Sequence, residues 1–326
     1  MRVLVTGGAG YVGSHASKQL VKSGHEVLIV DNLAEGHQAA VGNLPFVSVD
    51  LLDRERLAAT LKEHEIEAVM HFAAFAYVGV SVTDPAKYYH NNIVGSLSLL
   101  NAMRDAGVDR IVFSSSCATY GIPVSVPITE DHPQNPISPY GYTKLVIEHA
   151  LADYSHAYGL GYAALRYFNA SGAAADGTIG EDHDPETHLI PLILQVALGQ
   201  RESVDIFGSD YPTPDGTCIR DYIHVDDLAT AHVAALEKLK PGMQLKLNLG
   251  TGHGASVQEV VDLCREITGH PIPVRKVDRR EGDPPALVAN AAAAKRELNW
   301  QARYSMREVV ESAWAWHSKH PRGYGK

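Results

Sequence analysis

The first half of the chain alternates short apolar runs with longer helical patterns, and this alternation is its strongest constraint on folding. The runs are too short for helices and are typical of strands. They are Arg2–Thr6, Glu26–Asp31, Phe46–Asp50, Ala68–Phe72 and Arg110–Ser114. Helical patterns cover roughly 13–23, 53–64 and 88–106. Repeated strand–helix units predict a parallel sheet with helices on both faces. Such sheets bind ligands beyond the carboxyl ends of their strands.

The later chain reads differently. The segment 170–217 is rich in Gly, Asp and Pro, with one clear helix near Leu189–Gly199, and the strict alternation is also missing from about Gly252 on. Tyr222–Val225 and Lys246–Leu249 are typical of strands that could return to the main sheet. We therefore predict an α/β fold with a doubly wound parallel sheet and a smaller mixed α/β domain. The expected boundaries are 1–169 plus about 221–250 for the first domain, and about 170–220 plus 251–326 for the second.

Charge and composition exclude several classes of function. The 326 residues carry a formal net charge of −10, which argues against a general nucleic-acid binder or a protein of anionic membranes. No apolar run approaches the roughly 20 residues that span a bilayer, and the N-terminus lacks the regions of a signal peptide. The three cysteines form neither a disulfide framework nor a CxxC pair, and the 17 histidines include no HExxH pattern. These features favour a reduced, cytoplasmic, metal-free protein.

A glycine motif follows the first predicted strand and opens a helix. Gly7, Gly10 and Gly13 have the spacing Gly-x-x-Gly-x-x-Gly. Gly7 permits a tight turn, Gly10 lets the backbone approach a pyrophosphate, and Gly13 allows close packing of helix on strand. The pyrophosphate would then lie at the helix N-terminus, where free N–H groups and the helix dipole favour an anion. The motif predicts a dinucleotide-binding domain of the Rossmann type.

Acidic residues end the next two predicted strands. Asp31 lies 18 positions beyond Gly13, where its carboxylate can accept hydrogen bonds from ribose hydroxyls and would repel a 2′-phosphate. This favours NAD over NADP. Asp50, at the end of the third strand, suits the adenine edge. Because strand, glycines, helix and acid occur in the expected order, the cofactor prediction does not depend on the glycines alone.

A Ser–Tyr–Lys set predicts acid–base chemistry beside the nicotinamide. Tyr140 and Lys144 are four residues apart in a helical pattern that begins at 138 and reaches about 158, so they share a helical face. A nearby ammonium and the positive nicotinamide ring are expected to lower the tyrosine pKa from about 10. Ser116 follows the strand that ends at Ser114 and can bind the same substrate oxygen. Tyr142 is the weaker base candidate because it points away from Lys144.

These residues resemble the extended short-chain dehydrogenase/reductase family, and within it the UDP-sugar 4-epimerases. The resemblance covers nearly the whole chain. Its markers are TGGAGYVGSH at the start, DNL at 31–33, HFAA at 71–74, SSS at 114–116, SPYGYTK at 138–144, LRYFN at 165–169, IFG at 206–208, GTCIRDYIHVDDL at 216–228 and RREGD at 279–283. The resemblance implies a bound NAD that is reduced and reoxidised in each turnover, with Tyr140 and Ser116 acting at the sugar 4-hydroxyl.

The resemblance also assigns binding residues. For NAD they are Gly7, Gly10, Tyr11, Val12, Gly13, Asp31, Asn32, Asp50, Leu51, Phe72, Ala73, Ala74, Asn91, Ser114, Tyr140, Lys144 and Tyr167. For the UDP-sugar they are Ser116, Tyr140, Asn169, His188, Leu189, Asp205, Phe207, Arg220, Tyr222, Arg280 and Asp283. The arginines suit phosphate because their planar forks donate two hydrogen bonds at once. No metal is expected. Family members further suggest a homodimer formed through the helical patterns 88–106 and 140–158.

Some positions depart from the family pattern. Ala76 and Val80 stand where many hexose epimerases carry Lys and Glu. A related branch, which has HFAA, AYVG and THLIP as this chain does, includes both UDP-galactose epimerases and UDP-arabinose/UDP-xylose epimerases. The choice between hexose and pentose is therefore open. Leu287 occupies the position near a hexose C2 substituent, which predicts weak or no use of N-acetylhexosamines. A non-catalytic NAD-binding regulator is the alternative from another class. Cys117 and Ala118 supply no carboxylate after the serine strand, unlike the usual dehydratases and decarboxylases of the family.

Overall fold

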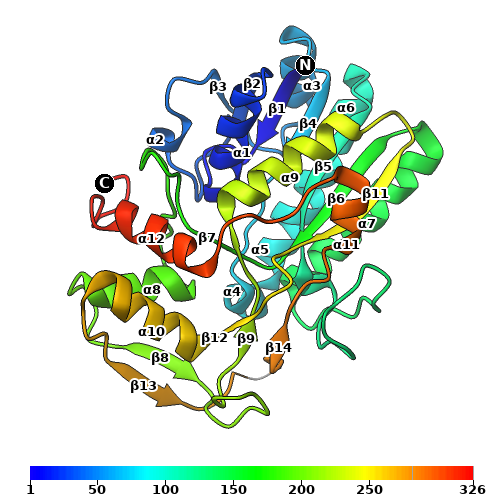
Figure 1. Ribbon diagram of the computed structural model, residues 1–326. Helices are drawn as coiled ribbons and strands as arrows, with labels where there is room; N and C mark the ends of the chain where they lie inside the picture. Colours follow the sequence, from blue (N-terminus) through cyan, green and yellow to red (C-terminus); the bar gives the residue numbers. More distant parts are fainter. Residues whose placement is uncertain (281, 326) are drawn as a thin grey trace.

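The computed structural model describes residues 1–280 and 282–325 and contains one large parallel sheet (Figure 1). Its strand order is β11-β6-β5-β4-β1-β2-β3, and every neighbouring pair is parallel. The strands are β1 (Arg2–Thr6), β2 (Glu26–Asp31), β3 (Phe46–Ser48), β4 (Ala68–His71), β5 (Arg110–Ser116), β6 (Gly161–Tyr167) and β11 (Gln244–Leu249). The five strands expected from the first half are confirmed, with β3 and β4 shorter and β5 longer than expected.

Helices cover both faces of this sheet, as the doubly wound prediction requires. On one face, α1 (Tyr11–Lys22) and α9 (Val225–Lys238) pack through Leu20, Leu228 and Leu236 against Val3 and Val5. The other face is covered by α3 (Arg54–Glu63), α6 (Gly95–Ala106) and α7 (Pro139–Tyr158). The shorter helices beside the sheet are α2 (Gln38–Val41), α4 (Val78–Thr83), α5 (Pro85–Tyr88) and α11 (Ala292–Leu298). We call this unit the sheet lobe.

The smaller mixed α/β part is also confirmed, and we call it the second lobe. It joins two stretches of chain, with the parallel pair β8 (Val204–Phe207) and β13 (Val274–Val277) near the bottom of Figure 1. The helices α8 (Leu189–Ala197), α10 (Val257–Thr268) and α12 (Met306–His317) share one core with β8. A three-stranded sheet, ordered β12 (Ala255–Ser256), β9 (Ile219–Arg220) and β14 (Ala286–Leu287), completes it. Glu281 of the RREGD marker and Lys326 of the expected second domain lie outside the described residues.

One strand expectation is wrong. The 222–225 run does not return to the main sheet: β10 (Tyr222–His224) pairs in parallel with β7 (Asn169–Ser171) in a separate two-stranded sheet. The strand next to β6 at the edge of the main sheet is β11, which corresponds to the 246–249 run that was also expected to join this sheet. Because β11 already pairs with β6 along its full length, the hydrogen-bonding groups of β10 find their partner in β7 instead.

The helical pattern at 88–106 is interrupted as well. Residues Tyr89–Val94 form a π-helical segment between α5 and α6, with wider turns than the continuous α-helix that was expected. Such segments occur frequently at functional sites. In this chain the segment carries Asn91 and Asn92, whose amides have different surroundings: Asn92 is buried and Asn91 lines the cleft described below.

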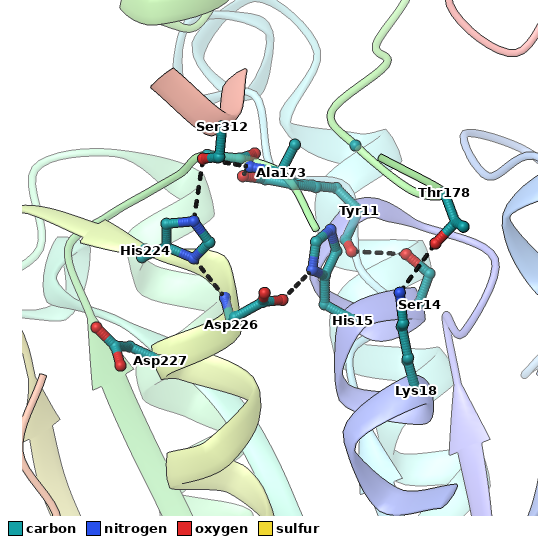
Figure 2. A network of polar contacts seen from close by, with 12 residues as sticks. Tyr11, Ser14, His15, Lys18, Ala173, Thr178, His224, Asp226, Asp227 and Ser312 are labelled. Atoms are coloured by element: carbon teal, nitrogen blue, oxygen red, sulfur yellow. Dashed lines mark hydrogen bonds and ion pairs between the residues drawn. The ribbon is translucent and has the colours of Figure 1, made fainter. Parts of the chain in front are cut away.

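A polar network ties the glycine-motif helix to the second lobe (Figure 2). His15 Nδ1 on α1 lies 2.6 Å from Asp226 Oδ1, and the Asp226 backbone N–H donates to His224 Nδ1 at 3.0 Å. On its other side, His224 Nε2 lies 3.0 Å from Ser312 Oγ on α12.

No helix in the part of the chain that the structure describes combines the length and apolarity needed to cross a membrane.

Candidate active site

The glycine motif forms a tight turn between β1 and α1. Gly7 has a φ of +71°, a conformation that favours glycine. A Cβ on Gly7 would lie 2.5 Å from the Ala73 backbone nitrogen, and one on Gly13 would lie 2.1 Å from the Gly7 carbonyl oxygen. Gly10 is the N-cap of α1, so the free N–H groups of the first turn follow it. The turn and the close packing expected of Gly7 and Gly13 are therefore present.

A cleft opens over this turn at the carboxyl ends of β1, β2 and β4. Many of the residues assigned to NAD line it: Gly7, Gly10, Asp31, Asn32, Asp50, Leu51, Phe72, Ala73, Ala74 and Asn91. Sequence reasoning missed Glu35, Gly36 and Phe75, which line it too. Gly36 is required for a steric reason, since a Cβ at this position would lie 2.9 Å from the Ala9 carbonyl carbon. Such an approach depends on the tertiary fold and leaves no local sequence pattern.

The carboxylate of Asp31 holds the walls of the cleft in place. It accepts hydrogen bonds from the backbone N–H groups of Ala9, at 3.1 Å, and Leu33, at 2.8 Å. Burial raises the pKa of Asp31, and these N–H donors counter the shift. Next to it, the amide nitrogen of Asn32 donates to Asp50 Oδ2 at 2.9 Å. The two acidic positions predicted to meet the adenosine half of NAD are thus joined through Asn32 at one side of the cleft.

Ser116, Tyr140 and Lys144 come together where β5 ends and α7 begins. Ser116 is the last residue of β5, and Ser138 caps α7 by accepting from the Gly141 N–H at 3.2 Å. Lys144 Nζ donates to the Ser114 carbonyl at 2.9 Å and lies 5.8 Å from the Tyr140 ring centroid. Tyr140 is only 7% exposed, whereas Tyr142 is 50% exposed. This difference agrees with the choice of Tyr140 as the base candidate.

Burial dominates the protonation of this pair. It raises the pKa of Tyr140, while the Ser116 hydroxyl partly counters the shift. It also lowers the pKa of Lys144 to about 7, against the opposing effect of Glu148. The expectation of a lowered tyrosine pKa is therefore not met by the protein's own groups, because desolvation of the phenolate outweighs them. The Cys117 thiol has its pKa raised to about 12 by burial, in accord with an inert packed thiol.

A buried ion pair supports the helix face that carries the base. Glu148 lies one turn beyond Lys144, and its carboxylate is 2.6 Å from Arg166 on β6. The Ser115 hydroxyl donates to Glu148 Oε1 at 2.6 Å, and Arg166 donates to the Tyr120 hydroxyl at 2.8 Å. Glu148 was missed from the sequence, although its spacing places it on the face shared by Tyr140 and Lys144.

Two neighbouring asparagines of the π-helical segment, one lining the cleft and one buried, hold the loop after β4. Asn92 accepts from the Phe75 N–H at 2.9 Å and donates to the Phe75 carbonyl at 3.0 Å, so it clamps the loop after β4. Asn91 donates to Asn92 Oδ1 at 2.9 Å and lines the cleft. The Tyr167 hydroxyl lies 2.9 Å from Ser114 Oγ, next to Lys144 in the same region. Asn92, absent from the sequence-based set, thus acts as a positioning residue for Phe75.

The residues assigned to the UDP-sugar form charged and aromatic pairs in the second lobe. The Arg280 guanidinium lies 3.9 Å from the centroid of the Phe207 ring. Arg220 forms an ion pair with Asp283, and Asp205 accepts two hydrogen bonds from Arg275, at 2.7 and 2.8 Å. Arg275 was not in the predicted set.

Other members of that set lie in different surroundings. Asn169 and Tyr222 are paired in register on β7 and β10, where Tyr222 is buried. The His188 imidazole faces Glu181 and Glu186, and Leu189 begins α8 directly after it. The hydroxyl of Tyr11 donates to the Gly172 carbonyl at 2.7 Å, so its phenol connects the two lobes. Val12 lies in the first turn of α1.

Comparison with known proteins places the chain in the family that the sequence motifs resemble. The model of the NAD dependent epimerase/dehydratase family matches residues 3–250. The chain belongs to this family. A UDP-glucose 4-epimerase of Halalkalibacterium halodurans is 52% identical over 99% of this chain and 98% of its own.

Solved structures extend the likeness to the whole fold. A UDP-glucose 4-epimerase from Brucella ovis in complex with NAD superposes with a TM-score of 0.93 at 52% identity, over 96% of this chain and 97% of its own. Another from Stenotrophomonas maltophila, with bound NAD and formylated UDP-arabinopyranose, has a TM-score of 0.95 at 45% identity, over 99% of both chains. The family resemblance seen in the sequence is confirmed.

Proposed function

We propose that this chain interconverts UDP-galactose and UDP-glucose through a transient 4-keto sugar, with a bound NAD. The observation that carries the proposal is the position of Tyr140, Ser116 and Lys144 at the carboxyl edge of the sheet that also forms the NAD-type cleft. Full-length relatives named UDP-glucose 4-epimerase support the same reaction. A non-catalytic regulator would need the cleft but not a buried Tyr–Lys pair with an adjacent serine.

The cleft fits a dinucleotide. Gly7 and Gly10 bring the backbone close to the space where a pyrophosphate would lie. For the adenosine half, Asp31 ends β2, and Asp50 lines the same cleft two residues beyond the end of β3. Lys144 and Asn91 would hold the nicotinamide riboside. When bound there, NAD supplies a hydride acceptor and donor together with a positive ring. That positive charge would add to the Lys144 ammonium and favour the phenolate of Tyr140, whose pKa burial raises.

Each of the other site residues then has its own role in the proposed reaction. As its phenolate, Tyr140 Oη would take the proton of the sugar 4-hydroxyl when the C4 hydride passes to the bound NAD, and would return it when hydride comes back to the opposite face of C4. Ser116 Oγ hydrogen-bonds the same oxygen, and Lys144 provides the cationic neighbour. In the second lobe, Arg220 and Arg280 hold the diphosphate, Asn169 assists, and Phe207 lies in the uridine pocket. The sugar swings about the diphosphate between the two transfers, so anchoring of the nucleotide and freedom of the sugar are both required.

A substrate panel tests the proposal. Purified protein is assayed for kcat/KM with UDP-galactose, UDP-xylose and UDP-N-acetylglucosamine, and its NAD content is measured by acid release. The proposal expects retained NAD and the highest kcat/KM with UDP-galactose. A protein that holds NAD but converts no UDP-sugar would contradict it and support the regulator.

A pentose substrate is the second candidate. One structural neighbour holds a UDP-arabinopyranose derivative, and Ala76 and Val80 depart from the pattern of many hexose enzymes. A kcat/KM for UDP-xylose that exceeds the value for UDP-galactose would favour it. Leu287 on β14 packs against a small buried cluster formed by Tyr120, Ile128, Phe168 and Ala289. Its bulk supports the expectation of weak or no turnover of N-acetylhexosamines.

We further propose a homodimer in the cytoplasm. The outer face of the π-helical segment and α7 exposes Tyr89, Val94, Tyr142 and Tyr158. The rings of Tyr89 and Tyr142 meet edge to face with centroids 6.3 Å apart, which joins the two elements into one apolar surface. Sedimentation equilibrium should give twice the 35.3 kDa chain mass, and Tyr142→Glu should shift the equilibrium to the monomer. A monomeric parent protein would contradict this assignment.

A further inference from the structure

Four side chains in the segment before α8 converge on one point. They are Glu181, His183, Glu186 and His188, and one ligand-type atom from each lies within 4.8 Å of all the others. His188 Nδ1 is 2.9 Å from Glu186 Oε1 and 3.0 Å from Glu181 Oε1. His183 Nδ1 is 3.4 Å from Glu181 Oε1 and 3.5 Å from Glu186 Oε2. Two nitrogens and two carboxylates therefore face a common centre.

The surroundings make this centre unusual for an ion-pair cluster. The side chains of Glu181 and Glu186 are only 4% and 5% exposed, so two carboxylates are buried side by side. Buried carboxylates need compensating positive charge. The buried Nδ1 of His183 has no hydrogen-bond partner within the described structure, although it points at both carboxylates. Its nearest carboxylate oxygens, at 3.4 and 3.5 Å, form ion pairs with it but no well-aligned hydrogen bond.

We propose that these four residues bind one divalent transition-metal ion of the zinc class. Two imidazole nitrogens and two carboxylate oxygens form a donor set that suits such ions, with four protein ligands in a tetrahedral arrangement. A dication with two neutral imidazoles and two carboxylates also balances the buried charge. Ligand atoms around tetrahedral zinc lie about 3.3 Å apart. Binding would therefore lengthen the contacts of His188 with the two carboxylates slightly and shorten the widest separations in the cluster, which reach at most 4.8 Å. The inference departs from the sequence-based expectation of a metal-free protein and from the assignment of His188 to the UDP-sugar. It does not rest on the proposed reaction.

The geometry assigns the ion a structural role. Four protein ligands leave no open position for a reacting group, and none of the four residues lines the nucleotide cleft. The cluster instead touches both lobes. The His183 ring meets the rings of Tyr11, in the glycine motif, and Tyr77, at the start of α4, with centroids 6.2 and 5.9 Å apart. The Tyr77 hydroxyl donates to Glu35, a cleft residue, at 3.3 Å. A bound ion would thus fix the segment 181–188 against the cofactor side of the molecule.

Protonated imidazoles are the competing occupants of this centre. Burial alone would lower the histidine pKa values, but Glu181 and Glu186 raise the pKa of His183 to about 9 and that of His188 to about 10. Two imidazolium ions would then balance the two carboxylates without a metal. The two states differ in what they retain: the metal site holds one ion per chain through dialysis, and the ion-pair cluster holds none.

Metal content and the visible spectrum of a cobalt-loaded protein test the proposal. The parent protein is treated with a strong chelator, loaded with excess Zn²⁺, dialysed against metal-free buffer and analysed by mass spectrometry for metals. The proposal expects one retained equivalent of zinc per chain. His183→Ala and Glu186→Gln should each lose that equivalent. His64→Ala, which removes an exposed histidine elsewhere, should keep it. Reloading with Co²⁺ should give the intense visible bands of tetrahedral coordination in the parent and not in the two variants.

The thermal midpoint supplies a second readout. Because an ion that binds only the folded state stabilises it, Zn²⁺ should raise the midpoint of the parent and of His64→Ala, and leave Glu186→Gln nearly unchanged. A parent protein that retains no zinc would overturn the proposal in favour of the ion pairs. Equal zinc retention by Glu186→Gln and the parent would overturn it as well. If the variants fail to fold, the visible spectrum of the cobalt-loaded parent protein tests the proposal by itself. Weak bands typical of octahedral cobalt would contradict the site.

Discussion

The two lobes build their halves of the candidate site by different means. In the sheet lobe, backbone geometry does most of the shaping: a left-handed Gly7, a helix that begins after Gly10 and strands that end at Asp31 and Ser116. In the second lobe, pairs of side chains shape the site. The partners come from segments about 60 to 80 residues apart, as with Phe207 and Arg280 or Arg220 and Asp283. Backbone-built sites leave a local pattern in the sequence, whereas sites built from distant pairs do not. The lobes should therefore also respond differently to substitution.

The largest effect is expected from removal of the base in the sheet lobe. Tyr140→Phe should lower kcat by up to about 10⁴-fold, because positioned acid–base groups contribute on that scale, while the NAD content stays at the parent level. The measurement is turnover of UDP-galactose together with NAD content. Tyr142→Phe is the matched control, since it removes a phenol hydroxyl from the same helix and keeps the aromatic ring on the proposed dimer surface. Activity that survives in Tyr140→Phe would remove Tyr140 from its role.

Buried and exposed ion pairs offer the next contrast. Glu148→Gln should cost about 3–5 kcal/mol of unfolding free energy, because it leaves the buried Arg166 charge without its partner. Asp205→Asn breaks the pair with Arg275, which is 68% exposed, so its effect on unfolding should be much smaller. Urea denaturation checks both variants. Equal losses of stability in the two variants would contradict the view that the buried pair of the sheet lobe matters more for folding than the exposed pair of the second lobe.

The glycine turn should be sensitive to a single methyl group. Gly13→Ala places a Cβ 2.1 Å from the Gly7 carbonyl oxygen, so the turn must shift. We expect a loss of about 1–3 kcal/mol of stability, typical of overpacking, together with a fall in bound NAD. Gly79→Ala is the control, since a Cβ there meets nothing within 4 Å. The measurements are thermal unfolding and NAD content after gel filtration, and a Gly13→Ala protein with full NAD content would argue against this turn as the pyrophosphate site.

The smallest effect is expected in the second lobe. Arg280→Ala removes the cation above Phe207 and one predicted diphosphate contact, and should raise KM for the UDP-sugar about tenfold, equivalent to about 1.4 kcal/mol. The NAD content and the unfolding midpoint should not change. Steady-state kinetics with UDP competition measures the effect. A fall in NAD content would instead place Arg280 in the cofactor site and break the comparison between the lobes.

This difference also explains how much of the molecule the sequence reveals. The order of strands, glycines and acids predicts the sheet and the NAD-type cleft, because each depends on residues close together in the chain. The partner of β10 could not be predicted, since β10 and β11 compete for sheet edges and only the full fold decides between them. The roles of Glu148 and Asn92 also escaped prediction because their partners lie on other elements. In the second lobe, the binding residues came from family resemblance, and the Glu–His cluster before α8 from the structure alone.

The central claim is that hydride leaves and returns at C4 of the sugar without exchange with solvent. Purified protein is mixed with UDP-galactose in D₂O with no added cofactor, and proton NMR follows the anomeric signals and the C4 position. We predict conversion to UDP-glucose with the original hydrogen retained at C4. Deuterium at C4 would show that a proton is removed and replaced there, and no conversion even after NAD is added would contradict the proposed hexose reaction.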